Sequence, residues 1–405
     1  DFRLDSRVLG LRVSSAGSGP ASCLPPTRSP SRRPMSYRPP HLRGGQRGPP
    51  AAARPATAPP RSAAAATASG FTPSGASLRQ RLSQRSAAAA ACVPPAEAAA
   101  AGGTGFGTCM RMCCEREWRE RERFRELSRL EYAAGSTEHD SRPKCDPELA
   151  VKRFKRPDAG APPPAAAELR PLPVLCHTVD FLLLLWQRRS DAAPLDRFAF
   201  ISDRLRAVMQ DISVQRLASS AVELLSRIAR FHAVMEPAFC SAPKGGFSSV
   251  QNREMLCNAL ISALEEGTAP PPIPLHAELL SYNILLHADQ PTTLLSELRR
   301  APAAVRRQPS VCLALRVAAA FAAGDAVGFW RGVRALPPLT SCCTLHLLPS
   351  LRAALLCQHD ASFKLSIPLL AISRRLGLRQ GAETARVLAA HGVTLQPPPP
   401  ITTAA

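Results

Sequence analysis

Apolar residues recur at spacings of three and four along most of the chain from Cys113 onward, and Pro and Gly residues separate the periodic stretches. In residues 195–212, for example, Phe198, Ile201 and Leu205 follow this spacing, and the next stretch repeats it. Such spacing places the apolar side chains on one face of a helix. Two amphipathic helices in succession predict a helical hairpin, and the pattern as a whole predicts an all-α fold.

Short helices make up most of this periodic region. No part of it before residue 363 alternates convincingly between apolar and polar positions, as a half-buried strand would. Short loops and the absence of a repeat of fixed length are typical of an irregular α-solenoid of stacked helical hairpins. The predicted helices cover residues 114–132, 174–189, 195–212, 214–236, 250–265, 274–286, 291–299, 311–323, 325–336, 342–357, 368–376 and 380–391.

The last part of the chain has a different pattern. Residues 363–367 are compatible with a short strand, two helices follow with Gly377 between them, and residues 393–396 alternate before a run of prolines. A helix, a tight turn, a helix and a short strand indicate a winged-helix-like unit. A three-helix cap on the solenoid would give nearly the same pattern. The candidate nucleic-acid contacts of this unit are Arg374, Arg375, Arg379 and Arg386.

The first part of the chain has no such periodicity. Residues 1–103 hold 14 Arg, no Lys and three acidic residues among Pro, Ala, Ser and Gly. This composition buries too little apolar surface to offset the entropy of ordering, so we expect a disordered arm. A basic arm attracts polyanions, although a GC-rich coding region would give the same composition. The chain begins with Asp, so we expect a fragment or an imperfect gene model, with Met35 as a candidate start.

These patterns divide the chain into five parts. The predicted parts are a disordered basic arm (1–103), a first helix and linker that carry a motif (104–167), a helical solenoid (168–358), a winged-helix-like end (359–396) and a disordered tail (397–405).

Cysteine content and hydropathy bear on the cellular compartment. The chain has 13 cysteines and no secretory signal, which favours a reducing compartment. Its longest run of large apolar residues, 181–186, has six residues, whereas a membrane helix needs about 20. We therefore expect a soluble intracellular protein without a membrane segment.

Three cysteines, Cys109, Cys113 and Cys114, lie within six residues, and His139 and Cys145 follow them. Together they could supply soft ligands for zinc or form a redox site. Structural zinc sites, however, repeat a pair of ligands across a short knuckle, and the spacing C-x-x-x-C-C does not. The spacing favours packing at the start of a helix.

Residues 115–131 contain six Glu and six Arg. Equal numbers of the two charges give no net positive field for nucleic acid. Glu115 with Arg119 and Glu117 with Arg121 have the favourable i,i+4 order. We therefore predict a solvated helix with one narrow buried stripe, formed by Met112, Phe124, Leu127 and Leu130.

No catalytic arrangement emerges from the sequence. The Gly-rich segment 102–107 lacks the Lys-Ser/Thr of a phosphate-binding loop and follows no predicted strand. The histidines on apolar helical faces have no Ser or Asp in a recognisable motif beside them. We therefore expect no enzymatic activity, no cofactor and no bound metal.

Several segments match, in order and spacing, the motifs of one protein family. Residues 107–121 (GTCMRMCCEREWRER) resemble the opening motif of the Sac-three/GANP family of messenger-RNA-export scaffolds, in which Gly-Thr-Cys and Met-Cys-Pro precede a Glu/Arg-rich helix. The resemblance covers about residues 104–396, but Met110 and Cys114 stand where the family has prolines. Further matches are residues 148–154 (ELAVKRF), 169–175 (LRPLPVL), 198–215 (FAFISDRLRAVMQDISVQ), 229–232 (ARFH) and 282–286 (YNILL).

The resemblance implies a PCI-like helical solenoid that ends in a winged helix. It also implies two partners, a protein with a PCI domain and a small acidic stabilising protein, in a platform that binds RNA or single-stranded nucleic acid. The residues that match the family motifs are expected to be structural. They are Gly107, Thr108, Cys109, Met112, Cys113, Lys152, Arg170, Pro171, Asp203, Arg204, Arg206, Asp211 and Gln215.

The chain most resembles the short vertebrate members of this family, and the resemblance implies an association with centrosomes and the mitotic spindle. We therefore expect a non-enzymatic scaffold that acts in centrosome duplication, spindle assembly and mitotic progression. It would bind centrosomal or spindle components and lie in the cytoplasm, at the centrosome and on the spindle. The alternative is a messenger-RNA-export scaffold in the nucleus and at the nuclear pore, which binds nucleic acid together with its PCI-domain partner.

Overall fold

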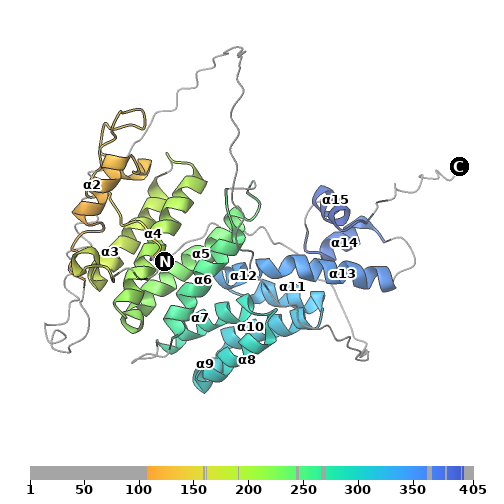
Figure 1. Ribbon diagram of the computed structural model, residues 1–405. Helices are drawn as coiled ribbons and strands as arrows, with labels where there is room; N and C mark the ends of the chain where they lie inside the picture. Colours follow the sequence, from red (N-terminus) through yellow and green to blue (C-terminus); the bar gives the residue numbers. More distant parts are fainter. Residues whose placement is uncertain are drawn as a thin grey trace, which may run out of the picture. The chain divides into compact units, whose positions relative to one another are not determined.

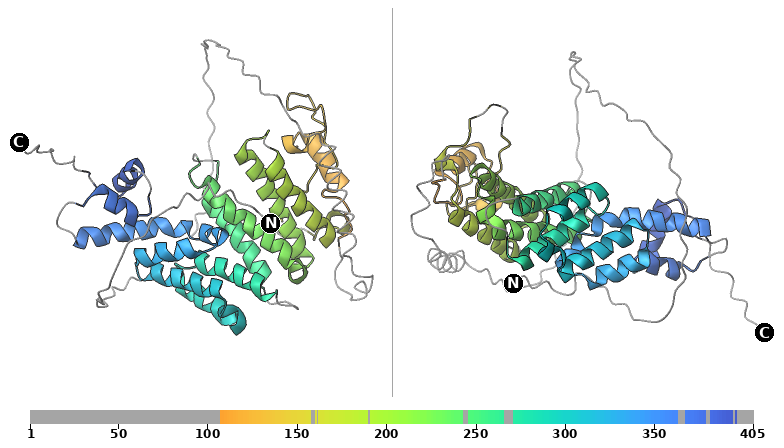
Figure 2. Two further views of the ribbon diagram at one scale, coloured as in Figure 1. Left: turned by 180° about the vertical axis from the view of Figure 1, so that it is seen from behind. Right: turned by 90° about the horizontal axis from the view of Figure 1, so that it is seen from below.

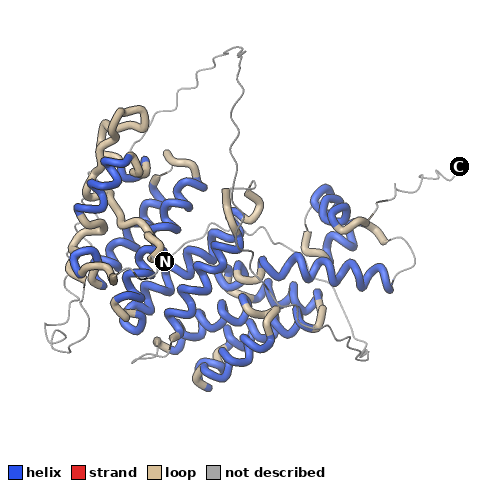
Figure 3. The backbone as a smooth tube through the Cα atoms, viewed as in Figure 1, coloured by secondary structure: helices blue, strands red, loops and turns tan. Residues whose placement is uncertain are grey.

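Helices form all the regular elements in the part of the chain that the computed structural model describes (Figure 3). Beyond the helices, those residues contain one isolated antiparallel bridge, between Tyr132 and Cys145. The all-α prediction is therefore confirmed for them, whereas the predicted disorder of residues 1–103 and 397–405 lies outside them. The described residues are 107–157, 160, 162–189, 191–242, 246–265, 271–362, 367–378, 381–393 and 395.

The order of the helices can be followed in Figure 1. The α-helices are α2 (Glu115–Phe124), α3 (Leu172–Arg188), α4 (Pro194–Val214), α5 (Val222–Phe239), α6 (Ser249–Leu264), α7 (Ile273–Leu286), α8 (Pro291–Arg300), α9 (Ala303–Arg306), α10 (Pro309–Ala322), α11 (Ala326–Ala335), α12 (Pro338–Cys342), α13 (Leu348–Ser362), α14 (Leu369–Arg375) and α15 (Gly381–Ala390). The 3₁₀ helices are η2 (Arg129–Glu131), η3 (Ala166–Glu168), η4 (Ala218–Ala221) and η5 (Leu345–Leu347).

Nine of the twelve predicted helices are confirmed to within two residues at each end. Proline explains several of the sharp starts: α4, α8 and α10 each begin at a proline, whose missing N–H has no partner in a first turn anyway. The prediction of one helix over residues 214–236 was wrong at its start, where η4 precedes α5. The predicted helix 342–357 is divided into the end of α12, η5 and α13, and α9 was missed.

The predicted helix over residues 114–132 was also wrong, because α2 ends at Phe124. Arg125 has left-handed backbone angles (φ 60°, ψ 37°), and its N–H closes the last turn on the carbonyls of Arg121 and Glu122. Phe124 was expected in the buried stripe but is 58% exposed. The early stop turns the chain away before Leu127 and Leu130 could continue the same face.

Helix α7 lies at the centre of its neighbours and packs against α6, α8, α9, α10 and α12. Every residue from 279 to 286 is buried, as expected for a helix that is apolar on all sides. The extensively packed neighbours α5 and α6, α7 and α10, α10 and α11, and α3 and α4 can be followed from two further sides in Figure 2. This packing supplies the core on which the helices are held.

A cluster of aromatic rings joins α3, α4 and α5. Phe198 of α4 stacks on Phe231 of α5 at 6.3 Å and meets Phe239 at 5.6 Å, measured between ring centroids. Trp186 of α3 meets Phe231 edge-on at 6.0 Å. Because aromatic pairs add to the free energy gained by burial, this cluster fixes α3, α4 and α5 against one another, and α4 carries the motif residues Asp203, Arg204, Arg206 and Asp211.

The end of the described chain is a pair of helices, α14 and α15, which contact each other. Gly377 ends α14 with φ +68°, and its Cα lies so close to Trp330 of α11 that a Cβ atom would clash with the indole ring. The Trp330 indole N–H also donates to the carbonyl of Arg375 at 2.8 Å. The predicted helix, turn and helix are therefore present, whereas residues 363–366, 394 and 396 of the predicted strands lie outside the described residues.

Two described stretches, Ala166–Arg188 and Pro338–Ser362, are long and apolar enough to cross a membrane by length and composition alone. Core helices of soluble proteins meet the same criterion. The first stretch contains Arg170, which is fully buried in an ion pair with Asp211, and the second is divided among α12, η5 and α13. The absence of a membrane segment stays a prediction.

A buried histidine makes stability depend on pH. His232 is fully buried, its Nδ1 lies 2.9 Å from Oδ1 of Asn252, and burial lowers its pKa to about 4. Between this value and the unfolded pKa of about 6.5 the unfolded chain binds more protons, so stability falls as pH falls through this window. Between pH 7 and pH 5 this loss amounts to about 2 kcal/mol, and we expect His232→Gln to remove it.

The measurement is urea unfolding at about pH 7 and about pH 5, followed by circular dichroism. His139→Gln is the matched control, because the His139 side chain is 88% exposed. Equal pH dependence in the wild type and in His232→Gln would contradict the assignment.

Candidate functional site

The motif residues converge on one layer of charged and polar side chains between residues 107–171 and helix α4. We call this layer the polar seam. It lies mostly inside the protein, where a charge is stable only with close partners. The polar seam consists of Glu117, Arg121, Glu131, Lys152, Arg170, Arg204, Asp211 and Gln215.

Asp211 of α4 is the first of two carboxylates around which the seam is organised. Its Oδ2 accepts a hydrogen bond from Nε of Arg170 at 2.7 Å, and its Oδ1 accepts one from Nζ of Lys152 at 2.7 Å. The side chains of Asp211 and Arg170 have no exposed surface. Lys152 also donates to the carbonyl of Glu168 at 2.8 Å, and Arg170 donates to that of Met112 at 3.3 Å. Asp211 therefore joins α4 to three separate segments.

Gln215, which follows the last turn of α4, holds the first described residue of the chain. Its Oε1 accepts a hydrogen bond from the N–H of Gly107 at 2.8 Å, and its Nε2 donates to the carbonyl of Arg170 at 2.9 Å. A Cβ atom on Gly107 would lie 2.3 Å from the carbonyl oxygen of Leu169. The contact leaves space for glycine alone.

We expect Gly107→Ala to lower the free energy of unfolding by about 1–3 kcal/mol, because the added methyl group must push the Leu169 backbone away. Urea unfolding measures the change. Gly381→Ala is the matched control: its Cβ would meet only Leu369 Cδ2 at 3.7 Å, and alanine is the better residue inside a helix. Equal stability of the two variants would show that the close approach does not matter.

Glu131 is the second organising carboxylate. Both of its oxygens accept hydrogen bonds from Nη1 of Arg121, at 2.8 and 2.7 Å, and Oε2 also accepts from Nη2 of Arg204 at 3.1 Å. The N–H of Val151 donates to Oε1 at 3.0 Å. Glu131 has no exposed surface, and it ties α2 to α4 through two arginines.

The structure therefore corrects the solvated-helix prediction for one side of α2. Glu117 and Arg121 are 6% and 3% exposed, and Glu117 accepts a hydrogen bond from the N–H of Arg153 at 2.8 Å. The prediction holds for Glu115 and Arg119, whose side chains are exposed. Spacing alone does not separate the two pairs, because both have the same i,i+4 order.

Sequence reasoning identified the residues around Asp211 and missed Glu131 and Arg121. One signal could have found them. Arg204 lies on a predicted buried helix face, and a buried arginine needs an acidic partner. Glu131 lies just before the polar linker and was counted among the surface charges.

Two further motif residues act at the edge of the seam. The carboxylate of Asp203 accepts a hydrogen bond from the N–H of Phe154 at 3.3 Å. The guanidinium of Arg206 lies 3.9 Å from the centre of the Phe154 ring, a cation–π contact. Both residues thus hold the segment that follows Lys152 against α4.

The cysteines of the motif pack beside Arg121. Cys113 is 1% exposed and forms a small core with Cys145 and Ala150, and Nη2 of Arg121 lies 3.4 Å from its sulfur. Burial raises the pKa of Cys113 above its usual range and that of Cys145 to about 12. A protonated thiol is a poor metal ligand and a poor nucleophile, so this environment favours packing.

The remaining motif residues hold the chain at the same place. The N–H of Thr108 donates to the carbonyl of Ala166 at 2.8 Å, and that of Cys109 to Leu169 at 2.9 Å. Pro171 is the residue directly before α3. Among the described residues, no group of three His, Cys, Asp or Glu side chains could hold a metal ion.

Three of the four candidate nucleic-acid contacts lie on the last two helices. Arg374 of α14 and Arg386 of α15 are exposed. Nη1 of Arg375 lies 3.2 Å from Nε2 of His359, so Arg375 is engaged within the protein. Arg379 lies outside the described residues.

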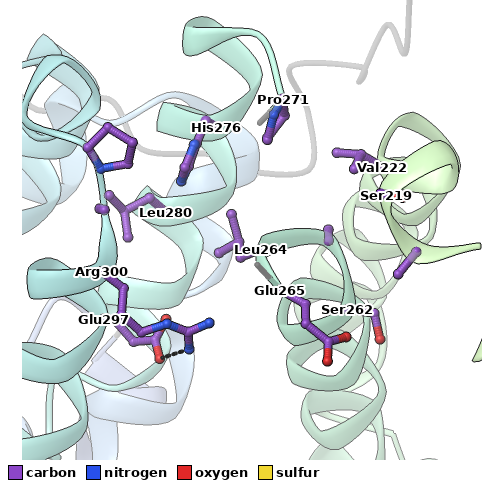
Figure 4. Close-up of a pocket in the computed structure, with 14 residues that line it drawn as sticks. Ser219, Val222, Ser262, Leu264, Glu265, Pro271, His276, Leu280, Glu297 and Arg300 are labelled. Carbon is purple, nitrogen blue, oxygen red and sulfur yellow. Dashed lines mark ion pairs between the residues drawn. The ribbon is translucent and has the colours of Figure 1, made fainter. Parts of the chain in front are cut away.

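A cavity of about 180 Å³ lies among α5, α6, α7 and α8 (Figure 4). Its polar side chains include Ser219, Ser262, His276 and the ion pair of Glu297 with Arg300, whose closest atoms are 3.5 Å apart. Nδ1 of His276 has no hydrogen-bond partner, so neither serine is paired with it as a nucleophile with its base. The described lining therefore offers no catalytic pair of this kind.

The model of the SAC3/GANP family matches residues 112–397 of the chain. SAC3 family protein B of Arabidopsis thaliana is 26% identical over 312 residues, which are 72% of this chain and 18% of that protein. SAC3 family protein 1 of Schizosaccharomyces pombe is 31% identical over 222 residues (53% and 21%), and the protein xmas of Drosophila melanogaster is 29% identical over 224 residues (53% and 10%). The chain thus spans about a fifth or less of the length of these relatives.

Proposed function

Because the chain belongs to the SAC3/GANP family, we propose that it is a non-enzymatic helical scaffold that assembles other proteins. The proposal rests on the observation that the motif residues bind one another and stabilise the fold. Lys152, Arg170, Asp211 and Gln215 hold one another by hydrogen bonds within the protein. Residues that form internal ion pairs stabilise the fold and hence the shape of its surface, and take no part in a reaction.

The proposed scaffold is a PCI-like solenoid with a winged-helix-like end. Pairs of neighbouring helices that pack through short connections support the solenoid, and the helix, turn and helix of α14 and α15 support the second part. Such helical stacks offer extended surfaces to other macromolecules. The proposed partners are a protein with a PCI domain and a small acidic protein.

Two cellular settings fit a scaffold of this family. One is centrosome duplication and spindle assembly, with centrosomal and spindle components as partners. The other is messenger-RNA export, with the PCI-domain partner in the nucleus and at the nuclear pore. Similarity to SAC3 family proteins favours neither setting over the other.

Purification of the tagged protein from dividing cells, with identification of co-purifying proteins, tests the proposal. We expect a stable protein partner, either a PCI-domain protein or a set of centrosomal proteins, and the identity of the partner decides between the settings. Recovery of neither would contradict the scaffold function.

Nucleic-acid binding is the second candidate function, and the exposure of Arg374 and Arg386 on the last two helices supports it. We expect the change of both residues to Gln to weaken binding of single-stranded RNA and to lower the salt dependence of log K by about one to two, since each phosphate contact releases counterions. Fluorescence anisotropy at several salt concentrations measures both effects. The matched control changes Arg123 and Arg142, which are also exposed; an equal loss in the control would rule out a contact at α14 and α15.

A further inference from the structure

The charge of the helices from α8 to α11 is unbalanced. Residues 291–336 contain seven arginines, no lysine and two acidic residues, Glu297 and Asp325, a net charge of +5. The acids are occupied within the protein: Glu297 accepts a hydrogen bond from Nδ2 of Asn283 at 3.0 Å, and Asp325 accepts one from the N–H of Gly328 at 2.9 Å. This part of the surface therefore carries a positive field.

Three of these arginines lie close together in the sequence, at the ends of two short helices. Arg299 is in the last turn of α8, Arg306 is in the last turn of α9, and Arg307 follows directly. All three are exposed, and none forms an ion pair with an acidic side chain among the described residues. We call them, together with Leu295, the arginine patch.

Some exposed arginines elsewhere on the described chain pair with acids. Arg116 pairs with Glu168, Arg119 with Glu115 at 2.5 Å, and Arg129 with Glu138. A single cation at each helix end is accounted for by the helix dipole. At the arginine patch each helix end carries two adjacent cations, Arg299 with Arg300 and Arg306 with Arg307, which is one more than the helix dipole accounts for.

An apolar side chain belongs to the same surface. Leu295 of α8 is 54% exposed, and it lies four residues before Arg299, hence on the same face of the helix. The inner sides of this region are anchored, since Ala301 and Val305 are buried and α9 packs against α7 and α10. The patch thus lies on anchored helices, α8 and α9 (Figure 1), and combines an exposed leucine with unpaired arginines.

We propose that the arginine patch binds an acidic amphipathic helix of a partner protein. Carboxylates of the partner would pair with Arg299, Arg306 and Arg307, and an apolar side chain would cover Leu295. Nucleic acid fits less well, because residues 291–307 contain no aromatic side chain on which a base could stack. A second copy of the chain would bring like charges together. The inference rests on the proposed scaffold function and specifies the chemistry of one partner.

Binding of defined probes to the full chain tests the inference. The first probe is a fluorescein-labelled peptide of about 20 residues, long enough to form a helix, with Glu and Leu at i,i+4 spacing on one face. The second is a scrambled peptide of the same composition, and the third is oligouridylate RNA. We expect the amphipathic peptide to bind most tightly.

The decisive variant changes Arg299, Arg306 and Arg307 to Gln. We expect it to bind the amphipathic peptide about tenfold more weakly, since three exposed ion pairs are lost. The control changes Arg116, Arg119 and Arg129 to Gln, which removes the same charge from arginines that have acidic partners. Leu295→Asn, which keeps every charge, should weaken binding of the amphipathic peptide and leave binding of the scrambled peptide unchanged.

Equal losses of affinity in the two triple variants would show that only net charge matters for binding, and would overturn the inference. Tighter binding of the RNA, lost through the same three arginines, would make the patch a nucleic-acid surface and overturn it as well. Neither result touches the scaffold proposal, which fails only if the protein has no stable partner in cells.

Discussion

Replacing Asp211 by Ala is expected to lower the free energy of unfolding by about 3–5 kcal/mol, because it leaves buried cations without their carboxylate. Arg170 has no exposed surface and Lys152 is 13% exposed, and both have Asp211 as their acidic partner, at 2.7 Å. Total stabilities of domains are about 5–15 kcal/mol. The loss is therefore large enough to unfold a substantial fraction of the protein, and urea unfolding followed by circular dichroism measures it.

Asp191→Ala is the matched control for this change. Asp191 also pairs with an arginine, Arg189, at 2.8 Å, but its side chain is 62% exposed. Exposed ion pairs contribute about 0–1 kcal/mol, so the control should remain close to the wild type. A loss below about 1 kcal/mol in Asp211→Ala would mean that the buried pair is not needed for the fold.

Replacing Glu131 by Ala is expected to lower the free energy of unfolding by about 1–3 kcal/mol, because Arg121 and Arg204 would lose their shared carboxylate but keep those of Glu117 and Asp203. The N–H of Val151 would lose its acceptor as well. Because these contacts join α2 to α4, we expect limited proteolysis to cut the region around α2 before the rest of the protein. Urea unfolding and the order of the proteolytic cuts are the two readouts.

Glu115→Ala is the corresponding control. Glu115 pairs with Arg119 on the same helix as Arg121, but its side chain is 56% exposed. The two glutamates lie in one charge run of the sequence, so a large effect for Glu131 and a small one for Glu115 would separate buried from solvated charge. Equal small effects would contradict the role assigned to Glu131.

Most of the helices between residues 172 and 335 could be predicted from the sequence because their apolar spacing is regular and prolines mark many of their starts. The burial of helix α7 on every side could not be predicted in this way, because it follows from the neighbouring helices and not from a polar face. The end of α2 could not be predicted. It depends on a left-handed backbone at Arg125, a conformation that arginine rarely adopts and that no turn residue announces.

The polar seam could be predicted only in part. The motif resemblance pointed to Lys152, Arg170 and Asp211 as structural residues, and they lie together. The separation of Glu117 and Arg121 from the solvated pair Glu115 and Arg119 depends on which side of α2 faces Glu131 and residues 151–153. The charge pattern does not reveal which side is buried, because i,i+4 pairs stabilise a helix on its buried side and on its exposed side alike.

The mass of the native assembly shows whether the protein acts as a scaffold. Sedimentation of the tagged protein from a gentle lysate of dividing cells should place it in a particle heavier than the 43.3 kDa chain, with at least one other protein in fixed proportion. A protein that sediments as a single 43.3 kDa chain, with no partner at any stage of the cell cycle, would contradict a scaffold function.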